Sequence, residues 1–137
     1  MGPTHVAGEA YSKLGASLLH TRVEDPPKVI VVTSPGPDEQ KSTICANLGA
    51  ALAQAGKRTL VVDCDFRKPA VHKVFGLRNL LGMADVLEGW REPQEVWEEP
   101  LERLKVITAG SIVPNPVDLL SGGRLSEFLA GTRREFD

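Results

Sequence analysis

The chain has 137 residues, of which 42% are hydrophobic and 25% charged, and its formal net charge is −2 at pH 7. This is the size of one ordinary domain, and the composition excludes a disordered chain. The interleaved charges exclude a general attraction to nucleic acid, and no apolar run approaches the roughly 18 to 20 residues that span a bilayer.

The N-terminal segment predicts one amphipathic helix. In "GEAYSKLGASLLH", which starts at Gly8, the residues Tyr11, Leu14 and Leu18 recur at spacings of three and four. The turn at Pro26-Pro27 ends this segment.

Two apolar runs with a helix between them follow. "KVIVVT" (28–33) has the continuous β-branched pattern of a parallel strand that is buried on both faces. Residues 42–55 keep helical periodicity up to Gly56, and "RTLVVD" (58–63) supplies a second strand. The order strand, loop, helix, strand predicts a βαβ unit of an α/β domain.

The second half of the chain predicts one more strand and several helices. "LKVITAG" (104–110) is the third strand, while "GMADVLEG" (82–89) and "PQEVWEE" (93–99) are expected to be short helices. A helix over 117–134 is expected to cover the sheet, with an interruption at Gly122-Gly123.

The residues between the first strand and the first helix suggest a phosphate-binding loop. Lys41, Ser42 and Thr43 follow a buried strand and open a helix, which is the context of such a loop. Lys41 would then reach the β and γ phosphates and the Ser42 hydroxyl would bind Mg²⁺, while Thr43 and the first-turn N–H groups hold the remaining oxygens. The strict pattern fails, however, because Pro35 and Gln40 occupy its two glycine positions.

An alternative interpretation of the same loop stays open. Residues 35–38 would form a turn, Asp38 would cap the helix, and Lys41 would be a surface lysine.

Asp63 and Asp65 favour a binding site. They end the second strand two residues apart, so both point to the same side at its carboxyl end, where ligand sites of α/β sheets gather. Such a pair can order Mg²⁺ through water and accept a proton from a hydroxyl nucleophile.

The cysteines and histidines of the sequence do not form a metal-binding pattern. Cys45 and Cys64 follow no secretory signal and have no ligands at suitable spacing, so we expect free thiols, buried as small hydrophobes, in a reducing cytoplasm. His5, His20 and His72 are too scattered to bind a metal ion.

Several longer motifs resemble one family, the bacterial tyrosine kinases (BY-kinases) and the related capsule or exopolysaccharide chain-length regulators. These motifs are "EAYSKL", "VTSPGPDEQKSTICANLGAALAQAGKRTLVVDCDFRKPAVHKVFGL", "GMADVLEG" and "VITAGSIVPNPVDLL". The resemblance implies a doubly wound, mainly parallel sheet of the P-loop NTPase type. It also implies transfer of phosphate from Mg-ATP to tyrosines on a neighbouring subunit.

Carried over by position, the resemblance implies three sets of site residues. The catalytic residues are Lys41, Asp63 and Asp65, and the metal-binding residues are Ser42 and Asp65. Asp63 resembles the base for the incoming hydroxyl and Asp65 the water-mediated Mg²⁺ ligand, although which aspartate does which stays open. The nucleotide-binding residues are Gly36, Pro37, Asp38, Glu39, Gln40, Lys41, Ser42, Thr43 and Arg67.

The loop departs from the family pattern at Asp38 and Gln40, where glycines are usual. A carboxylate about 4 Å from a phosphate oxygen would oppose binding by roughly 4 kcal/mol at an effective dielectric constant of about 20, nearly a thousandfold in affinity. We therefore expect phosphoryl transfer by this chain to be weak or absent.

The two ends of the chain also depart from the family pattern. The early helix lacks the arginines that serve ring assembly, since Ser12 and Gly15 follow Glu9. The chain stops at "RREFD", before the strand that carries the Walker B aspartate, which in relatives lies between the first two strands. We expect an N-terminal helix and lead-in over 1–27, and over 28–137 the N-terminal part of a nucleotide-binding domain, incomplete at the C-terminus with two unpaired strand edges.

Three functional hypotheses follow from this resemblance. The first is an ATP-binding domain of a tyrosine kinase in polysaccharide synthesis, cytoplasmic, held near the inner membrane by a membrane polysaccharide co-polymerase or adaptor, and able to form a homo-oligomer. The second is a nucleotide-independent interaction module for the same partner. The third, a partition or septum-site ATPase, ranks lowest because Gly36 occupies the position of that group's signature lysine.

Overall fold

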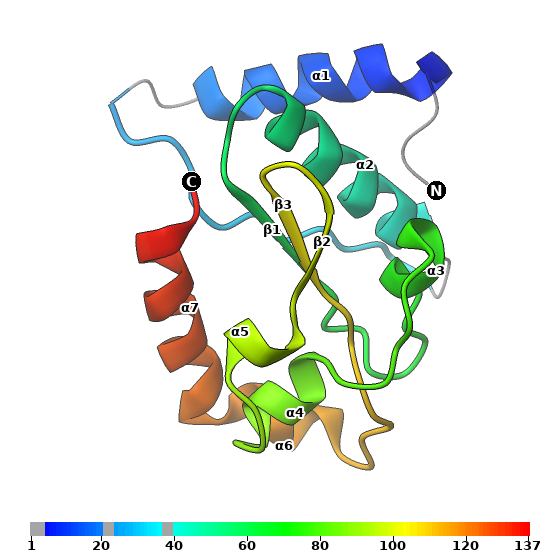
Figure 1. Cartoon of the computed structure of the whole chain (residues 1–137), viewed down its shortest axis with the longest axis vertical. Helices are drawn as coiled ribbons and strands as arrows, with labels where there is room; N and C mark the ends of the chain where they lie inside the picture. The colour runs from blue at the N-terminus through cyan, green and yellow to red at the C-terminus, as the bar shows by residue number, and fades with distance from the viewer. Residues whose placement is uncertain (1–4, 21–23, 37–39) are drawn as a thin grey trace.

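The computed structural model of the chain describes residues 5–20, 24–36 and 40–137. Helices precede, separate and follow the strands along it (Figure 1), which confirms the α/β class. The helices are α1 (His5–His20), α2 (Gln40–Gln54), α3 (Val71–Phe75), α4 (Met83–Leu87), α5 (Pro93–Val96), α6 (Pro116–Ser121) and α7 (Gly123–Glu135). The strands are β1 (Thr59–Val62), β2 (Glu98–Leu101) and β3 (Leu104–Ile107).

The strands form one small mixed sheet in the order β1-β3-β2. β1 and β3 are parallel, with Thr59 beside Leu104 and Val62 beside Ile107. β2 is antiparallel to β3. The expectation of a mainly parallel sheet therefore holds only for the β1–β3 pair among the described residues.

Helices cover both faces of the sheet (Figure 1), and each face has its own hydrophobic cluster. On one face Val61 and Val106 pack against α2 and α3, with Ala50 of α2 fully buried between them. On the other face Ile107 packs against α4 and α7, and Leu60 and Val62 join it. This alternation along β1 places its carboxyl end between two covered faces.

A glycine lets helix α2 approach β1 closely. A Cβ atom added at Gly49 would collide with Cγ2 of Val61, so no larger residue fits this contact without a shift. Gly56, with φ of 92°, ends the helix as the sequence predicted. The packing of α2 on β1 therefore fixes Lys41 at the start of the helix relative to the acids at the end of the strand.

Helix α1 packs on the outer side of α2 (Figure 1). The contact centres on buried Gly15, where an added Cβ would lie 3.2 Å from Cδ2 of Leu52. Across the residues that the structure describes, no helix is long and apolar enough to cross a bilayer.

The predicted first strand over 28–33 is wrong, because these residues form no strand in the structure. Val31 is 82% exposed and Val29 is 41% exposed, although both belong to an apolar run typical of a buried strand. The physical reason is that residues 28–33 have no strand to pair with. Within the described residues β1 pairs only with β3, and the outer edge of β1, which faces residues 28–33, is open. A groove of about 630 Å³, lined by residues 27–33, α2, β1 and α7, runs along that edge.

Two local predictions also need correction. The expected helix over 93–99 ends at Val96, and Glu98 begins strand β2, which turns back to β3 through Arg103 with φ of 65°. Antiparallel pairing with β3 across the short turn at 102–103 decides this segment, and the helical periodicity did not reveal it. Helix α3 was not predicted at all, whereas the predicted interruption at Gly122 separates α6 from α7.

Candidate functional site

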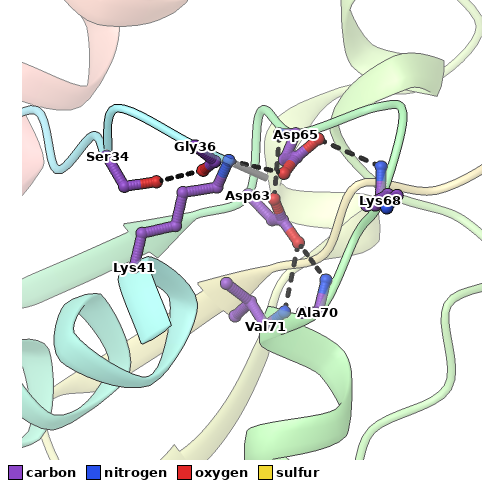
Figure 2. Close-up of polar contacts among 8 residues, drawn as sticks. All are labelled: Ser34, Gly36, Lys41, Asp63, Asp65, Lys68, Ala70 and Val71. Atoms are coloured by element: carbon purple, nitrogen blue, oxygen red, sulfur yellow. Dashed lines mark hydrogen bonds and ion pairs between the residues drawn. The ribbon is translucent and has the colours of Figure 1, made fainter. Parts of the chain in front are cut away.

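The loop after β1 and the first turn of α2 bring the predicted site residues together (Figure 2). Lys41 extends from the first turn of α2 toward Asp65. Asp63 lies below Asp65 in the view. These three residues and Ser42 line one end of the groove beside β1. The structure thus brings Lys41 and Ser42 together with the acid pair, but Thr43 does not line the groove.

Asp63 organises the loop that follows β1. Its side chain is buried, and both carboxylate oxygens accept hydrogen bonds from the main chain (Figure 2). Oδ1 accepts from the N–H of Asp65 at 2.9 Å, and Oδ2 accepts from those of Ala70 and Val71 at 3.2 Å each. Asp63 therefore ties the end of β1 to the start of α3 and fixes the backbone at Asp65.

Asp65 faces the lysine. Its Oδ2 lies 2.9 Å from Nζ of Lys41, and its Oδ1 accepts a hydrogen bond from the N–H of Lys68 at 3.0 Å. Burial opposes ionisation of this carboxyl, but the hydrogen bonds from Lys41 and Lys68 outweigh that effect and hold the pKa of Asp65 below its usual value. Asp65 is thus a charged, fixed carboxylate at the mouth of the groove.

The other predicted binding residues differ in their exposure. Ser42 is 5% exposed and follows Lys41 into the groove, whereas Thr43 and Arg67 are exposed. Gly36 is exposed, and its carbonyl oxygen accepts a hydrogen bond from the Ser34 hydroxyl at 2.7 Å (Figure 2). Gln40 is the exposed first residue of α2, while Pro37, Asp38 and Glu39 lie outside the described residues.

The sequence did not point to the groups that hold the acid pair in place. These are the main-chain N–H groups of Lys68, Ala70 and Val71, and main-chain groups carry no signature of residue type. The available signal was Pro69, which lies just before the N-cap Ala70 of α3, because a proline disfavours the helical conformation of the residue before it and so marks a boundary.

Both cysteines are free thiols that line the groove, which confirms the absence of a disulfide among the described residues. Cys45 is half-buried, but Cys64 is exposed, contrary to the expectation of two buried thiols. Cys64 stands between Asp63 and Asp65 in the loop after β1, where it is exposed.

We expect Cys64 to react slowly with alkylating reagents. Partial desolvation by the surrounding protein, with smaller effects of Asp63 and Cys45, raises the pKa of Cys64 from 9.0 to about 11. At pH 8 roughly one thiol in a thousand is then ionised, against about one in ten for an ordinary cysteine. Because a more basic thiolate is intrinsically a better nucleophile by about tenfold, the net alkylation rate should be about tenfold slower.

Peptide mapping by mass spectrometry after iodoacetamide treatment at pH 8 measures this rate separately for Cys64 and Cys45. The urea-unfolded chain is the reference. Equal rates at Cys64 in the native and unfolded chains would contradict the raised pKa.

Known proteins share this fold. The profile of the CobQ/CobB/MinD/ParA nucleotide binding domain family matches residues 30–134. The chain belongs to this family. Its similarity to bacterial tyrosine kinases identifies it, within the family, as a P-loop nucleotide-binding domain of the BY-kinase type.

Three of these tyrosine kinases show the extent of the likeness. Tyrosine-protein kinase YwqD of Bacillus subtilis is 36% identical over 126 residues, which are 91% of this chain and 53% of YwqD. Tyrosine-protein kinase wzc of Salmonella typhimurium is 33% identical over 136 residues, 98% of this chain and 19% of wzc. The kinase domain of the Escherichia coli tyrosine kinase ETK superimposes with a TM-score of 0.88 and 30% identity over 96% of this chain and 52% of that domain.

Proposed function

We propose that this BY-kinase-type domain binds ATP with Mg²⁺ and serves tyrosine phosphorylation in capsule or exopolysaccharide synthesis. The observation that carries the proposal is the placement of the Lys41 ammonium between the first turn of α2 and the carboxylate of Asp65. A helix N-terminus and an ammonium both attract phosphate, and a fixed acid beside them suits the cation that accompanies ATP. The chain spans about half of YwqD and a smaller share of wzc, so the activity of a whole protein is part of the proposal.

Each site residue has a role in this proposal. Lys41 binds the β and γ phosphates, the first-turn N–H groups of α2 hold further oxygens, and Arg67 contributes a second positive charge at the loop. Ser42 and Asp65 supply oxygen atoms of the type that Mg²⁺ prefers, and Mg²⁺ normally keeps water and phosphate oxygens in its remaining positions. The donor set therefore fits the cation, which when bound would neutralise charge on the transferred phosphate.

The two acids have different surroundings, and this bears on which of them accepts the proton of an incoming tyrosine. Asp63 is 4% exposed, and both of its carboxylate oxygens accept hydrogen bonds from main-chain N–H groups. The side chain of Asp65 is 21% exposed and faces the groove. A base must reach the hydroxyl that it deprotonates. Asp65 is the more accessible of the two acids; as the residue proposed for Mg²⁺ it would be a weak base, and Asp63 would act as base only after it releases its main-chain N–H partners.

Replacing Lys41 by alanine tests nucleotide binding. The variant should lose about a hundredfold or more in ATP affinity with Mg²⁺, because a charge-assisted contact with phosphate is removed. Isothermal titration calorimetry measures the Kd. Lys57→Ala, at the opposite end of the same groove, is the matched control and should bind like the parent.

Absence of ATP binding by the parent chain would favour a second function. If the parent chain binds no ATP at millimolar concentration, the fold serves as a nucleotide-independent module that docks on a membrane polysaccharide co-polymerase. The neutralisation of Lys41 by Asp65 is the observation that favours this second function.

The loop residues that depart from the family pattern give a separate test. Replacing both Asp38 and Gln40 by glycine should raise ATP affinity, because it removes a negative charge and a side chain where backbone must approach phosphate. A calorimetric comparison with the single variants separates the two contributions. Unchanged affinity in the double variant would show that these residues do not weaken the loop.

We also propose that an additional strand pairs with the open edge of β1. An additional strand in the groove would pair with β1 on one side and with residues 28–33 on the other, and it would cover Val29 and Val31. The sheet would then become the mainly parallel, doubly wound sheet expected from the sequence. Attachment to the inner membrane through a partner, and formation of a homo-oligomer, belong to the same proposal.

A further inference from the structure

The ion pair between Lys41 and Asp65 is the least exposed of those that the structure gives for its described residues. The side chains are 27% and 21% exposed, and the pair joins α2 to the loop after β1. By contrast, Lys13–Glu9 joins neighbouring turns of α1, Arg91–Glu95 joins a residue just before α5 to that helix, and both pairs are more exposed. A shielded pair between two elements interacts more strongly than such surface pairs do.

Asp65 is held in place independently of the lysine. Its own N–H donates to Oδ1 of Asp63, and its Oδ1 accepts from the N–H of Lys68. Asp63 is in turn fixed by Ala70 and Val71 (Figure 2). The carboxylate therefore cannot swing away freely, and the flexible side chain of Lys41 is the member of the pair that can move.

This geometry puts a carboxylate where a phosphate oxygen would compete for the same ammonium. Oδ2 of Asp65 lies at 2.9 Å, the distance of a charge-assisted hydrogen bond, and already neutralises the one positive charge of Lys41. A polyphosphate that approaches without a cation meets a paired lysine and a nearby negative charge. A cation that arrives with the polyphosphate offers Asp65 another positive partner.

We propose that Asp65 is a built-in competitor for Lys41, which weakens binding of cation-free nucleotide and so makes the site select the cation-bound form. The inference rests on the proposed function, because it takes Lys41 as the phosphate contact. It adds to that function a residue that sets which form of the nucleotide is accepted.

The test is calorimetric titration of ATP in EDTA with the parent chain and with Asp65→Asn. The variant keeps an oxygen that can accept from Lys68 but removes the charge, so it should bind cation-free ATP about five- to tenfold more tightly. Asp137→Asn is the charge-matched control. That carboxylate pairs with Arg58 at the other end of β1, roughly 20 Å away and beyond the screening length of about 10 Å at 0.1 M salt, so affinity should not change.

A Lys41→Met background separates competition from simple repulsion. If Asp65 acts by holding the lysine, adding Asp65→Asn to Lys41→Met should give a much smaller gain than it gives in the parent. An equal gain in both backgrounds would overturn the inference, since Asp65 would then merely repel ATP. Circular dichroism and urea unfolding check that all variants are folded.

The remaining outcomes are also decisive. Cation-free binding by the parent that Asp65→Asn leaves unchanged or weakens overturns the inference and leaves the proposed function standing. Binding by Asp65→Asn alone supports the inference in its strongest form. Failure of both chains to bind ATP, with and without Mg²⁺, overturns the proposed function and this inference together.

Discussion

Replacing Gly82 by alanine is expected to lower the free energy of unfolding by about 3 to 5 kcal/mol, which is a large fraction of the stability of a domain of this size. An added Cβ at Gly82 would collide with the carbonyl oxygen of Thr108 and lie 2.6 Å from the N–H nitrogen of Gly110. Both neighbours are main-chain atoms at the end of β3, so neither can rotate aside as a side chain could.

The close approach at Gly82 is held by several hydrogen bonds, which would be strained together. The N–H of Met83 donates to the carbonyl of Thr108 at 2.7 Å, and the N–H of Ala84 donates to that of Ala109 at 2.9 Å. Oδ2 of Asp85 accepts from the N–H of Gly82 at 2.8 Å. These bonds tie the start of α4 to the end of β3, so a shift at Gly82 disturbs the cluster around Met83 and Ile107.

Urea unfolding followed by circular dichroism measures the loss at Gly82, and Gly131→Ala is the matched control. Gly131 lies in α7 with no atom within 4 Å of an added Cβ, so alanine there should stabilise the helix by about 0.5 to 1 kcal/mol. A loss below about 1 kcal/mol for Gly82→Ala would contradict the contact.

Replacing Asp63 by alanine is expected to cost about 3 kcal/mol of stability and to disorganise the candidate site. The change removes the acceptor of the N–H groups of Asp65, Ala70 and Val71, and buried donors without a partner cost about 1 to 3 kcal/mol each before the loop relaxes. Since Asp63 fixes the backbone at Asp65, ATP affinity should fall as well.

Urea unfolding and ATP titration of three variants separate the two roles of Asp63. Glu127→Ala changes an exposed acid of α7 and should leave both measurements unaltered. Asp63→Asn keeps one acceptor oxygen and should lose about half as much stability as alanine. A stable Asp63→Asn protein that binds ATP but has lost phosphoryl transfer would favour Asp63 as the base, whereas full stability of Asp63→Ala would contradict the structural role.

The apolar pattern predicted those elements whose partners lie within the described residues. Residues 58–63 and 104–110 were expected as strands, and they contain β1 and β3, which pair with each other. The helix expected over 42–55 corresponds to α2, whose periodicity matches a face that packs on the sheet. The run over 28–33 has an equally strong pattern, yet it forms no strand, because a groove separates it from the open edge of β1 and no described strand pairs with it.

Residue types and spacing pointed to the site, but not to its internal contacts. The two-residue spacing of Asp63 and Asp65 predicted that both carboxylates point to one side. In the structure the loop turns after β1, so Asp63 faces the N–H groups of Ala70 and Val71 while Asp65 faces Lys41. Their different surroundings depend on α3, which no periodic pattern in the sequence predicted.

The sequence by itself determined the α/β class, the family resemblance and the residues that converge at the end of β1, because periodicity and short motifs are local properties of the chain. Only the tertiary structure decided which segment pairs with β3, that Lys41 is neutralised by Asp65, and that Asp63 is buried under main-chain N–H groups. These features depend on how separate elements pack against one another, and on whether a hydrogen-bonding partner is present at the edge of the sheet.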